Sequence, residues 1–268
     1  MNYNIKFIAI DVDGTLVTDD KRITEETIKA IRLANEKGAN VSIASGRPLS
    51  GINRYREYFK DDSLFITYNG AKVIKLDTNE TIFEMSMNSD DAKDVLEYAF
   101  TNKMHLFIWI NDELYTDELN EHVEYYQSIN MVKANIVPDF RLLYNNVTKI
   151  IIYDYNENLV KAKNDILRIN PNINCQFSIP VFLEIFNKEV SKGKAVEMIG
   201  KYYNLNKDEI MAIGDNFNDL SMIEYAGIGV AMGNAPEEIK RMATFVTKSN
   251  QEDGVAYAIN KFINKIGE

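Results

Sequence analysis

Pairs of carboxylates follow two short apolar segments of this 268-residue sequence. Asp11 and Asp13 come directly after the run that ends at Ile10, and Asp215 and Asp219 lie just beyond a second run. If both runs are strands of one parallel sheet, these side chains meet at its carboxyl edge, where open α/β folds bind ligands. Carboxylates grouped in this way can bind a hard cation, attack an electrophile or transfer a proton.

The first motif, D-V-D-G-T at residues 11–15, admits more than one interpretation. In an extended segment the two aspartates point the same way, and Gly14 lets the backbone turn sharply beside them. A plain polar turn after a strand is one alternative. A calcium loop of the EF-hand type is another, but its sixth position would be Leu16 instead of glycine and its twelfth Arg22 instead of glutamate.

Three further motifs occupy corresponding places, each at a predicted strand end or helix start. Ser45-Gly46 offers a hydroxyl and a backbone N–H to a phosphoryl oxygen, although the same pair occurs in ordinary turns. Lys192 opens a predicted helix after Ser191, where a cation is unfavourable unless it faces an anion. By itself Lys192 would be interpreted as a surface lysine. The plain interpretation of Gly214–Asp219 is that its Asp and Asn side chains cap the next helix.

The elements that must position these motifs alternate along both ends of the chain. Residues 5–10, 41–44 and 64–67 are predicted strands, with a helix after Thr24 and another after Pro48. A helix from 192 to about 203, strands at 210–213 and 227–232, and helices from 236 and about 252 continue the pattern. This rhythm predicts a parallel sheet covered by helices.

Residues 84–187 differ, because motif-like loops are missing there. Ser89 is expected to cap a helix, and 105–110, 149–153 and 181–186 are predicted strands. We interpret this part as an inserted α/β cap between two halves of a core, residues 1–83 and 188–268. Its histidines, tryptophan and many other aromatic residues are expected to be chiefly packing residues.

The amino-acid composition argues against several kinds of binding partner. Lys and Arg total 30 against 40 Asp and Glu, a net charge of −10, which disfavours nucleic-acid and membrane partners. An anionic substrate therefore needs a local cluster of cations. Cys175 cannot form an internal disulfide and is expected to be a small core residue, so a reducing cytoplasm is the predicted location. No signal peptide or membrane span is predicted.

The order D-x-D-G-T, S-G-R, lysine and G-D-x-x-N-D around an insert resembles the haloacid dehalogenase superfamily, and within it the Cof-type phosphatases with a large α/β cap. The resemblance covers essentially the whole chain. It implies a Rossmann-like parallel-sheet core and Mg²⁺-dependent hydrolysis of small phosphate monoesters, such as sugar phosphates or phosphorylated cofactors, through an aspartyl-phosphate intermediate.

The resemblance also implies residue roles. Asp11 is the nucleophile and Asp13 the general acid and base, and the metal is bound by Asp11, the Asp13 carbonyl and Asp215. The remaining roles concern the phosphoryl group: its oxygens are held by Val12, Ser45, Gly46, Lys192 and Asn218. Asp219 orients Lys192 or a metal-bound water, and Arg47 reaches a substrate anion or makes a structural ion pair.

Two alternatives stay open at this stage. A phosphomutase would transfer the phosphoryl group to a second sugar instead of water. A non-catalytic phosphate sensor would keep the fold, but such proteins often lose a catalytic group, and Asp11, Asp13, Lys192 and Asp215 are all present. The sequence does not predict an oligomeric state, the physiological substrate or the cap residues that select it.

Overall fold

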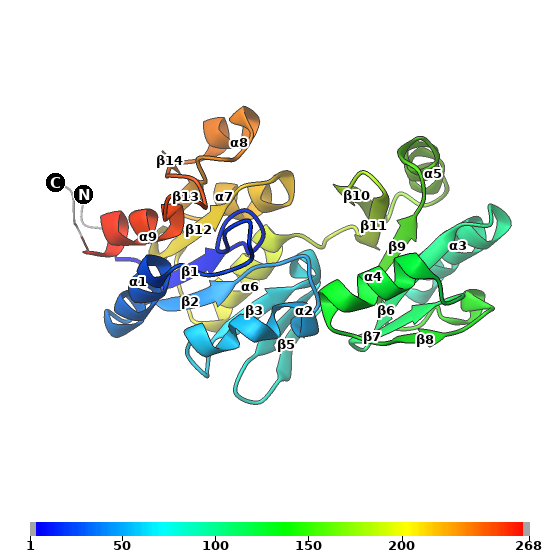
Figure 1. Cartoon of the computed structure of the whole chain (residues 1–268), viewed down its shortest axis with the longest axis horizontal. Coiled ribbons are helices and arrows are strands. Elements are labelled where there is room, and N and C mark those ends of the chain that lie inside the picture. The colour runs from blue at the N-terminus through cyan, green and yellow to red at the C-terminus, as the bar shows by residue number, and fades with distance from the viewer. Residues whose placement is uncertain (1–3, 265–268) are drawn as a thin grey trace. The chain divides into compact units, whose positions relative to one another are not determined.

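The computed structural model describes residues 4–264, which form two compact units (Figure 1). The first, called the core unit below, takes in the chain up to Gly46, Ile52–Phe83 and the chain from Ser191 onward. The second, called the cap unit, consists of Arg47–Gly51 and Glu84–Val190. Each unit has its own sheet and its own hydrophobic core.

The core unit is built on a five-stranded parallel sheet with the order β14-β13-β12-β1-β2. Its strands are β1 (Phe7–Ile10), β2 (Asn40–Ile43), β12 (Ile210–Gly214), β13 (Ile228–Ala231) and β14 (Phe245–Val246). β1 pairs with both β12 and β2, so the loops after these three strands leave the same edge of the sheet. The prediction of a parallel-sheet α/β core is confirmed.

One predicted strand belongs elsewhere. β3 (Leu64–Thr67) has the predicted bounds but lies in a separate three-stranded sheet with β4 (Lys72–Lys75) and β5 (Glu80–Glu84). A bridge between Ala44 and Ile66 and a hydrogen bond from the Ser45 amide to the Ile66 carbonyl (2.9 Å) join it to the end of β2. β4 returns after a short turn without a crossover helix, so β3 and β4 pair antiparallel.

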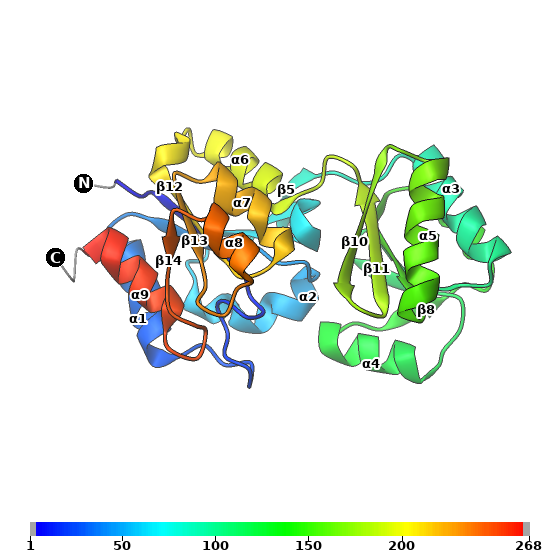
Figure 2. The same ribbon diagram turned by 90° about the horizontal axis from the view of Figure 1, so that it is seen from above.

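Helices cover both faces of the parallel sheet. α1 (Glu25–Glu36) begins after Thr24, whose hydroxyl accepts from the Thr27 amide as a cap, and it lies beside α9 (Gly254–Ile259), as Figure 2 shows. α6 (Lys192–Tyr202) and α7 (Leu220–Tyr225) pack together on a core that includes Phe7 and Ala9. Because side chains alternate along β1, Ile8 and Ile10 are buried against the opposite face.

The remaining helices of the core unit are short. They include α8 (Glu237–Met242) and a 3₁₀ turn at Phe217–Asp219, which precedes α7. A further 3₁₀ segment, Asn53–Tyr58, follows α2 (Leu49–Ile52), the predicted helix after Pro48, most of which belongs to the cap unit. No helix in the part of the chain from residue 4 to 264 is both long and apolar enough to cross a bilayer.

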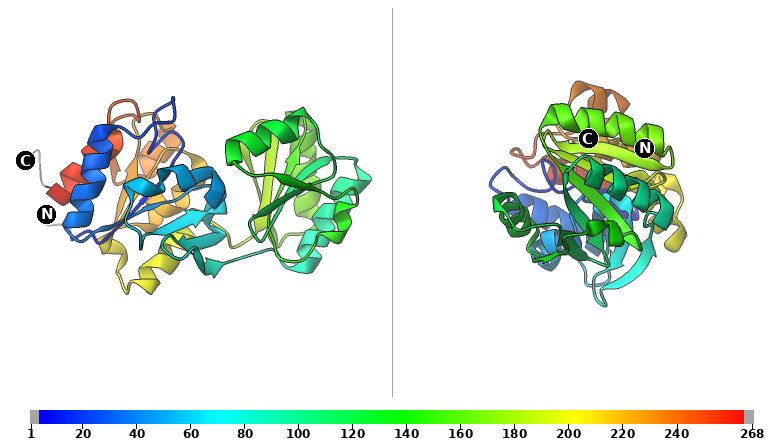
Figure 3. Two further views of the ribbon diagram at one scale, coloured as in Figure 1. Left: turned by 60° about the horizontal axis from the view of Figure 1, so that its bottom comes forward. Right: turned by 90° about the vertical axis from the view of Figure 1, so that its right-hand side faces the viewer.

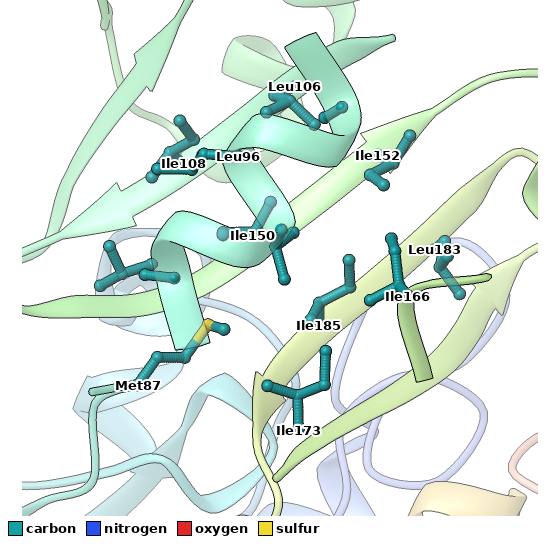
Figure 4. Close-up of a cluster of buried hydrophobic side chains, with 14 of the residues drawn as sticks. Met87, Leu96, Leu106, Ile108, Ile150, Ile152, Ile166, Ile173, Leu183 and Ile185 are labelled. Atoms are coloured by element: carbon teal, nitrogen blue, oxygen red, sulfur yellow. The ribbon is translucent and has the colours of Figure 1, made fainter. Parts of the chain in front are cut away.

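The cap unit contains a six-stranded mixed sheet with the order β10-β11-β9-β6-β7-β8. Its strands are β6 (His105–Ile110), β7 (Glu113–Thr116), β8 (Ala134–Ile136), β9 (Val147–Tyr153), β10 (Ile173–Ile179) and β11 (Phe182–Asn187). α3 (Ser89–Thr101) and α5 (Asn156–Ile169) run along one face (Figure 3). Between them and the sheet lies an aliphatic cluster that includes Leu96, Ile150 and Ile185 (Figure 4).

Two predictions for the cap unit can be compared with this structure. Cys175 is a buried core residue as expected, and burial raises the pKa of its thiol to about 12. The predicted cap of α3 is wrong by one residue, because the Asn88 side chain, not that of Ser89, accepts from the Asp91 amide (2.9 Å). Asn and Ser cap helices about equally well, so the local sequence alone did not separate them.

The other face of the cap sheet packs against α4 (Glu121–Asn130) through aromatic rings. Phe107 stacks on Tyr126 with 4.3 Å between ring centroids, and Phe182 meets Tyr126 edge-on. The Trp109 indole nitrogen donates to the Tyr126 hydroxyl over 3.0 Å. These rings are packing residues, as predicted.

Candidate active site

The loop after β1 brings Asp11 into the interior of the core unit. Asp11 is only 7% exposed, and its amide donates to the Ile213 carbonyl of β12 (2.9 Å). The chain then turns, because the Leu16 amide bonds to the Asp11 carbonyl and the Val17 amide to the Val12 carbonyl. The two carbonyl groups at the start of the motif thus accept from later amides of the same loop, and Asp13 forms a bridge with Val17.

Asp215, directly after β12, lies against this loop. The Thr15 hydroxyl donates to Asp215 Oδ1 over 2.7 Å. Gly14 has φ +84°, and a Cβ built there would stand 2.5 Å from Asp215 Oδ2. Both the backbone angle and the space therefore require glycine. Thr15 was not predicted as a site residue, although it belongs to the first motif.

Lys192 is completely buried and is not a surface lysine. Its Nζ lies 2.5 Å from Asp11 Oδ1 and 2.5 Å from Asp219 Oδ1. The residue is the first of α6, whose cap is the Ser191 hydroxyl, an acceptor for the Lys194 amide (3.1 Å). A cation at a helix N-terminus is unfavourable on its own, and the two carboxylates compensate for that position.

Asp219 holds the loop after β12 in shape. Its Oδ2 accepts from the amides of Asp215 (2.9 Å) and Asn216 (3.0 Å), while Oδ1 accepts from Lys192. The Asn216 side chain in turn accepts from the Phe217 amide (2.8 Å), which is the capping role expected for it. Because its oxygens already have these donors, Asp219 is poorly placed to bind anything further.

Burial and neighbouring charges shift the pKa values of Asp11, Asp215 and Lys192. The pKa of Asp11 is raised well above its usual value, first by burial and then by the charge of Asp219, against the opposing effect of Lys192. Burial also raises the pKa of Asp215 to about 6. Burial alone would lower the pKa of Lys192, but the charges of Asp11 and Asp219 raise it overall. The site is therefore short of positive charge.

This deficit and the donor set fit a divalent cation. Asp11, Asp215 and Asp219 each offer a carboxylate oxygen, and these three oxygens lie within 4.8 Å of one another. Asp219 is committed to Lys192 and two amides, which leaves Asp11 and Asp215 as the side chains that would hold a metal. An all-oxygen set suits a hard cation such as Mg²⁺ or Ca²⁺.

The side chain of Asp13 is in a more open position. It is 40% exposed, and its Oδ1 accepts from Lys21 Nζ over 2.8 Å. Lys21 has φ +63°, and its carbonyl accepts from the Tyr55 hydroxyl (3.4 Å). No motif in the sequence marks Lys21, because the contact arises from the turn that follows Val17.

Three of the predicted phosphate-binding residues, Ser45, Gly46 and Asn218, contact one unpredicted partner, Asn69. The Asn69 amide donates to the Ser45 carbonyl (2.9 Å), and the Asn218 side chain donates to Asn69 Oδ1 (3.0 Å). A Cβ on Gly46 would lie 2.9 Å from Asn69 Oδ1. The only local sequence signal at Asn69 is the pair Asn69-Gly70, which is typical of tight turns.

Arg47 and the Asp11 loop make further contacts that the sequence did not indicate. Arg47 belongs to the cap unit, where its Nη1 donates to the Ile129 carbonyl (3.3 Å).

In the core unit, two asparagine side chains bind the Asp11 loop. Asn234 Nδ2 donates to the Gly14 carbonyl (2.9 Å) and Asn250 Nδ2 to the Val17 carbonyl (3.0 Å). Both asparagines follow β13 or β14, so they fix the Asp11 loop from the C-terminal part of the chain.

Comparison with known proteins agrees with this geometry. Residues 8–259 match the sequence profile of the haloacid dehalogenase-like hydrolases. The chain belongs to this family. A relative of similar length is YxeH of Bacillus subtilis (strain 168), 35% identical over 96% of this chain and 98% of that protein.

Two other relatives are similar to this chain over nearly its whole length. A haloacid dehalogenase-like hydrolase from Bacteroides thetaiotaomicron has a crystal structure that superposes with a TM-score of 0.87 at 30% identity, over 97% of this chain and 100% of its own. The 5-amino-6-(5-phospho-D-ribitylamino)uracil phosphatase YitU of Bacillus subtilis (strain 168) is 30% identical over 96% of this chain and 97% of its own.

Replacing the buried Lys192 with an uncharged residue should destabilise the protein strongly. Lys192→Met leaves Asp11 and Asp219 buried without their partner, so we expect a loss of about 3–5 kcal/mol in the free energy of unfolding, measured by urea denaturation. Adding Asp219→Asn to that variant should recover part of the stability but no activity. A Lys192→Met protein as stable as the wild type would contradict the buried charge network.

The raised pKa of Asp215 gives the metal-free protein a pH dependence of definite sign. Its pKa is about 6 in the native state against an ordinary 3.8, so in that interval the native protein keeps a proton that the unfolded chain has released. The contribution of Asp215 to the free energy of unfolding therefore falls as pH rises through the interval. Melting curves in EDTA should show this fall, and Mg²⁺ near neutral pH should reverse it.

The matched variants for that measurement are Asp215→Asn and Asp61→Asn. Asp61 is an exposed carboxylate in the loop before β3. Asp215→Asn should lose part of the pH slope and most of the stabilisation by Mg²⁺, whereas Asp61→Asn should keep both. Equal stabilisation of the two variants by Mg²⁺ would remove Asp215 from the cation site.

Proposed function

We propose that this protein is a Mg²⁺-dependent phosphatase that hydrolyses small phosphate monoesters through a phosphoryl group carried on Asp11. The observation that supports the proposal most directly is a buried carboxylate, Asp11, with the Lys192 ammonium 2.5 Å away and Asp215 in the same acidic cluster. Membership of the haloacid dehalogenase-like hydrolases and the phosphatase activity in the name of YitU support it further.

The first step is a displacement at phosphorus. An Asp11 carboxylate oxygen forms a bond to the phosphorus while the bond to the ester oxygen breaks, and Asp13 gives a proton to the departing alkoxide. Ser45, Gly46, Asn218 and the backbone of Val12 hold the phosphoryl oxygens. Asp13 lies at the open side of the loop, with its carboxylate 40% exposed, where a leaving group can reach it.

The second step returns the enzyme to its starting state. Asp13, now ionised, takes a proton from a water molecule whose oxygen attacks the phosphorus. The bond between phosphorus and Asp11 breaks, inorganic phosphate leaves, and Asp13 is protonated again for the next turnover. One aspartate thus serves as the acid in the first step and as the base in the second.

Electrostatics decide whether these steps are possible in a protein with a net charge of −10. An anionic carboxylate cannot approach a phosphate dianion without positive charge between them. Lys192 provides one fixed charge, buried where water does not screen it. A bound Mg²⁺, held by Asp11, Asp215 and the Asp13 carbonyl, would neutralise the nucleophile and the transferring group.

We propose that the substrate is a small phosphorylated metabolite, either a sugar phosphate or a phosphorylated cofactor or its precursor. The cap, residues 84–187 in the sequence-based division, would select the leaving group, with Arg47 as one candidate contact. YitU is named for a phosphorylated ribitylaminouracil, which is a compound of this kind. We also expect a cytoplasmic location, for which the unpaired Cys175 is the main argument.

Replacing the nucleophile should abolish turnover without unfolding the protein. Asp11→Asn removes the attacking oxygen but keeps the size of the side chain, so phosphate release from a panel of esters with Mg²⁺ should fall to background. The Asp61→Asn protein should release phosphate as fast as the wild type, and a chelator should abolish phosphate release by both. Substantial turnover by Asp11→Asn would refute the assignment, and labelled phosphate found on a second sugar would indicate a phosphomutase instead.

Replacing the acid and base should slow both chemical steps. Asp13→Asn cannot donate or accept the proton, so kcat for a sugar phosphate should fall about 10²- to 10⁴-fold. The loss should be smaller for p-nitrophenyl phosphate, whose leaving group needs little protonation. Full-speed hydrolysis of both esters by Asp13→Asn would exclude Asp13 from proton transfer.

A further inference from the structure

The turn between β3 and β4 has an unusual backbone. Tyr68, Asn69 and Gly70 have φ angles of +51°, +57° and +103°, so three successive residues lie in the left-handed region. Asparagine and glycine adopt such angles readily, but a bulky residue such as Tyr68 rarely does, and holding it there costs folding free energy. Such a run persists only where the surroundings fix it.

A hairpin turn offers the plainest explanation, because Asn-Gly is common in tight turns that reverse a strand. Turns of that kind normally lie at the surface. Here Tyr68 is fully buried, Asn69 is 5% exposed and Gly70 is also buried. The turn therefore does more than connect two strands, because its residues contact three other segments of the core unit.

Its first contact is with the Ser45-Gly46 loop. The Asn69 amide donates to the Ser45 carbonyl over 2.9 Å, and the Asn69 side chain packs on Gly46 so closely that a Cβ there would lie 2.9 Å from Oδ1. Gly46 is predicted to offer its N–H to a phosphoryl oxygen. Asn69 therefore sets the direction in which this loop presents its donors.

A second contact is with the start of α6. A Cβ on Gly70 would collide with the Ser191 carbonyl, and it would lie 3.1 Å from the Lys192 amide. The glycine lets the turn touch the backbone that immediately precedes the buried lysine. The position of the Lys192 backbone thus depends on this turn.

The third contact is with Asn218, beyond β12. Its Nδ2 donates to Asn69 Oδ1 over 3.0 Å. An amide nitrogen carries two hydrogens, so Asn218 can give one to Asn69 and still direct the other toward a phosphoryl oxygen. The bond to Asn69 fixes the rotation of the Asn218 amide and thereby the direction of the second N–H.

From these contacts we infer that Asn69 is a positioning residue for the phosphoryl group, which it does not itself bind: it aligns Ser45-Gly46 and Asn218, while Gly70 sets the spacing to Lys192. The inference rests on the proposed phosphatase function. One strained, buried turn would then hold in register the three chain segments predicted to act together with the Asp11 loop.

Asn69→Gly is the variant that separates this role from a purely structural one. Glycine adopts a φ of +57° without strain, so the turn can keep its backbone while the side chain is lost. Asn204→Gly is the matched control, because Asn204 is also an asparagine with positive φ (+55°) but is exposed. Both proteins should melt within a few degrees of each other.

Two measurements then test the inference: kcat/KM for a phosphate ester with Mg²⁺, and the Kd of tungstate, a phosphate mimic, by calorimetry. Asn69→Gly should lower kcat/KM about ten- to a hundredfold and weaken tungstate binding, since small misplacements of donors cost that much. Asn204→Gly should match the wild type. Adding Asn218→Ala to Asn69→Gly should cost far less than Asn218→Ala alone, because Asn69 acts through Asn218.

The outcomes are separable. A kcat/KM and a tungstate Kd of Asn69→Gly within about twofold of the wild type, or fully additive losses with Asn218→Ala, would overturn the inference. A wild-type protein that binds tungstate but hydrolyses no ester would refute the proposed function, while the tungstate Kd values would still test the role of Asn69. A wild type that shows neither property would overturn both.

Discussion

The buried ammonium of Lys192 between Asp11 and Asp219 is the interaction on which the rest of the site depends. Removing three charged groups from water costs free energy, which is offset here because the Lys192 ammonium lies 2.5 Å from an oxygen of each carboxylate. The sum is one negative charge in excess, or two when Asp215 is counted. A divalent cation would neutralise that excess, so the charge pattern of the site fits such a ligand.

Close approach of backbone segments makes this concentration of charge possible. Gly14 and Gly70 let one chain segment touch another where any side chain would collide, and Asp219 ties its own loop together through two amides. Loops that follow parallel strands leave the same edge of the sheet, but that places them only in the same region. The contacts at these two glycines bring the functional atoms from neighbouring loops to hydrogen-bonding distance. Burial in turn strengthens every electrostatic interaction among them.

Burial of positive charge also explains how a strongly acidic chain could bind an anionic substrate. Lys192 is completely buried beside Asp11, where its field is least screened. The more exposed Asp13, paired with Lys21, has a different environment from Asp11 although only one residue separates them. Two aspartates of one motif can therefore take different chemical roles because one is buried beside a cation site and the other is open to solvent.

The sequence by itself determined the features that are encoded locally. The parallel α/β core followed from alternating elements, the start of α1 from Thr24, and the membership of the family from short motifs whose order around an insert is specific. Those motifs work locally because a strand end, a cap or a tight turn needs particular residues within a few positions. Tertiary structure alone decided that Lys192 is buried, that Lys21 meets Asp13 and that Asn69 joins Ser45 to Asn218. The contact between Asn69 and Asn218 spans 149 positions, and that between Lys192 and Asp11 spans 181. No local pattern specifies which distant carbonyl or carboxylate a side chain will reach once the sheet has formed.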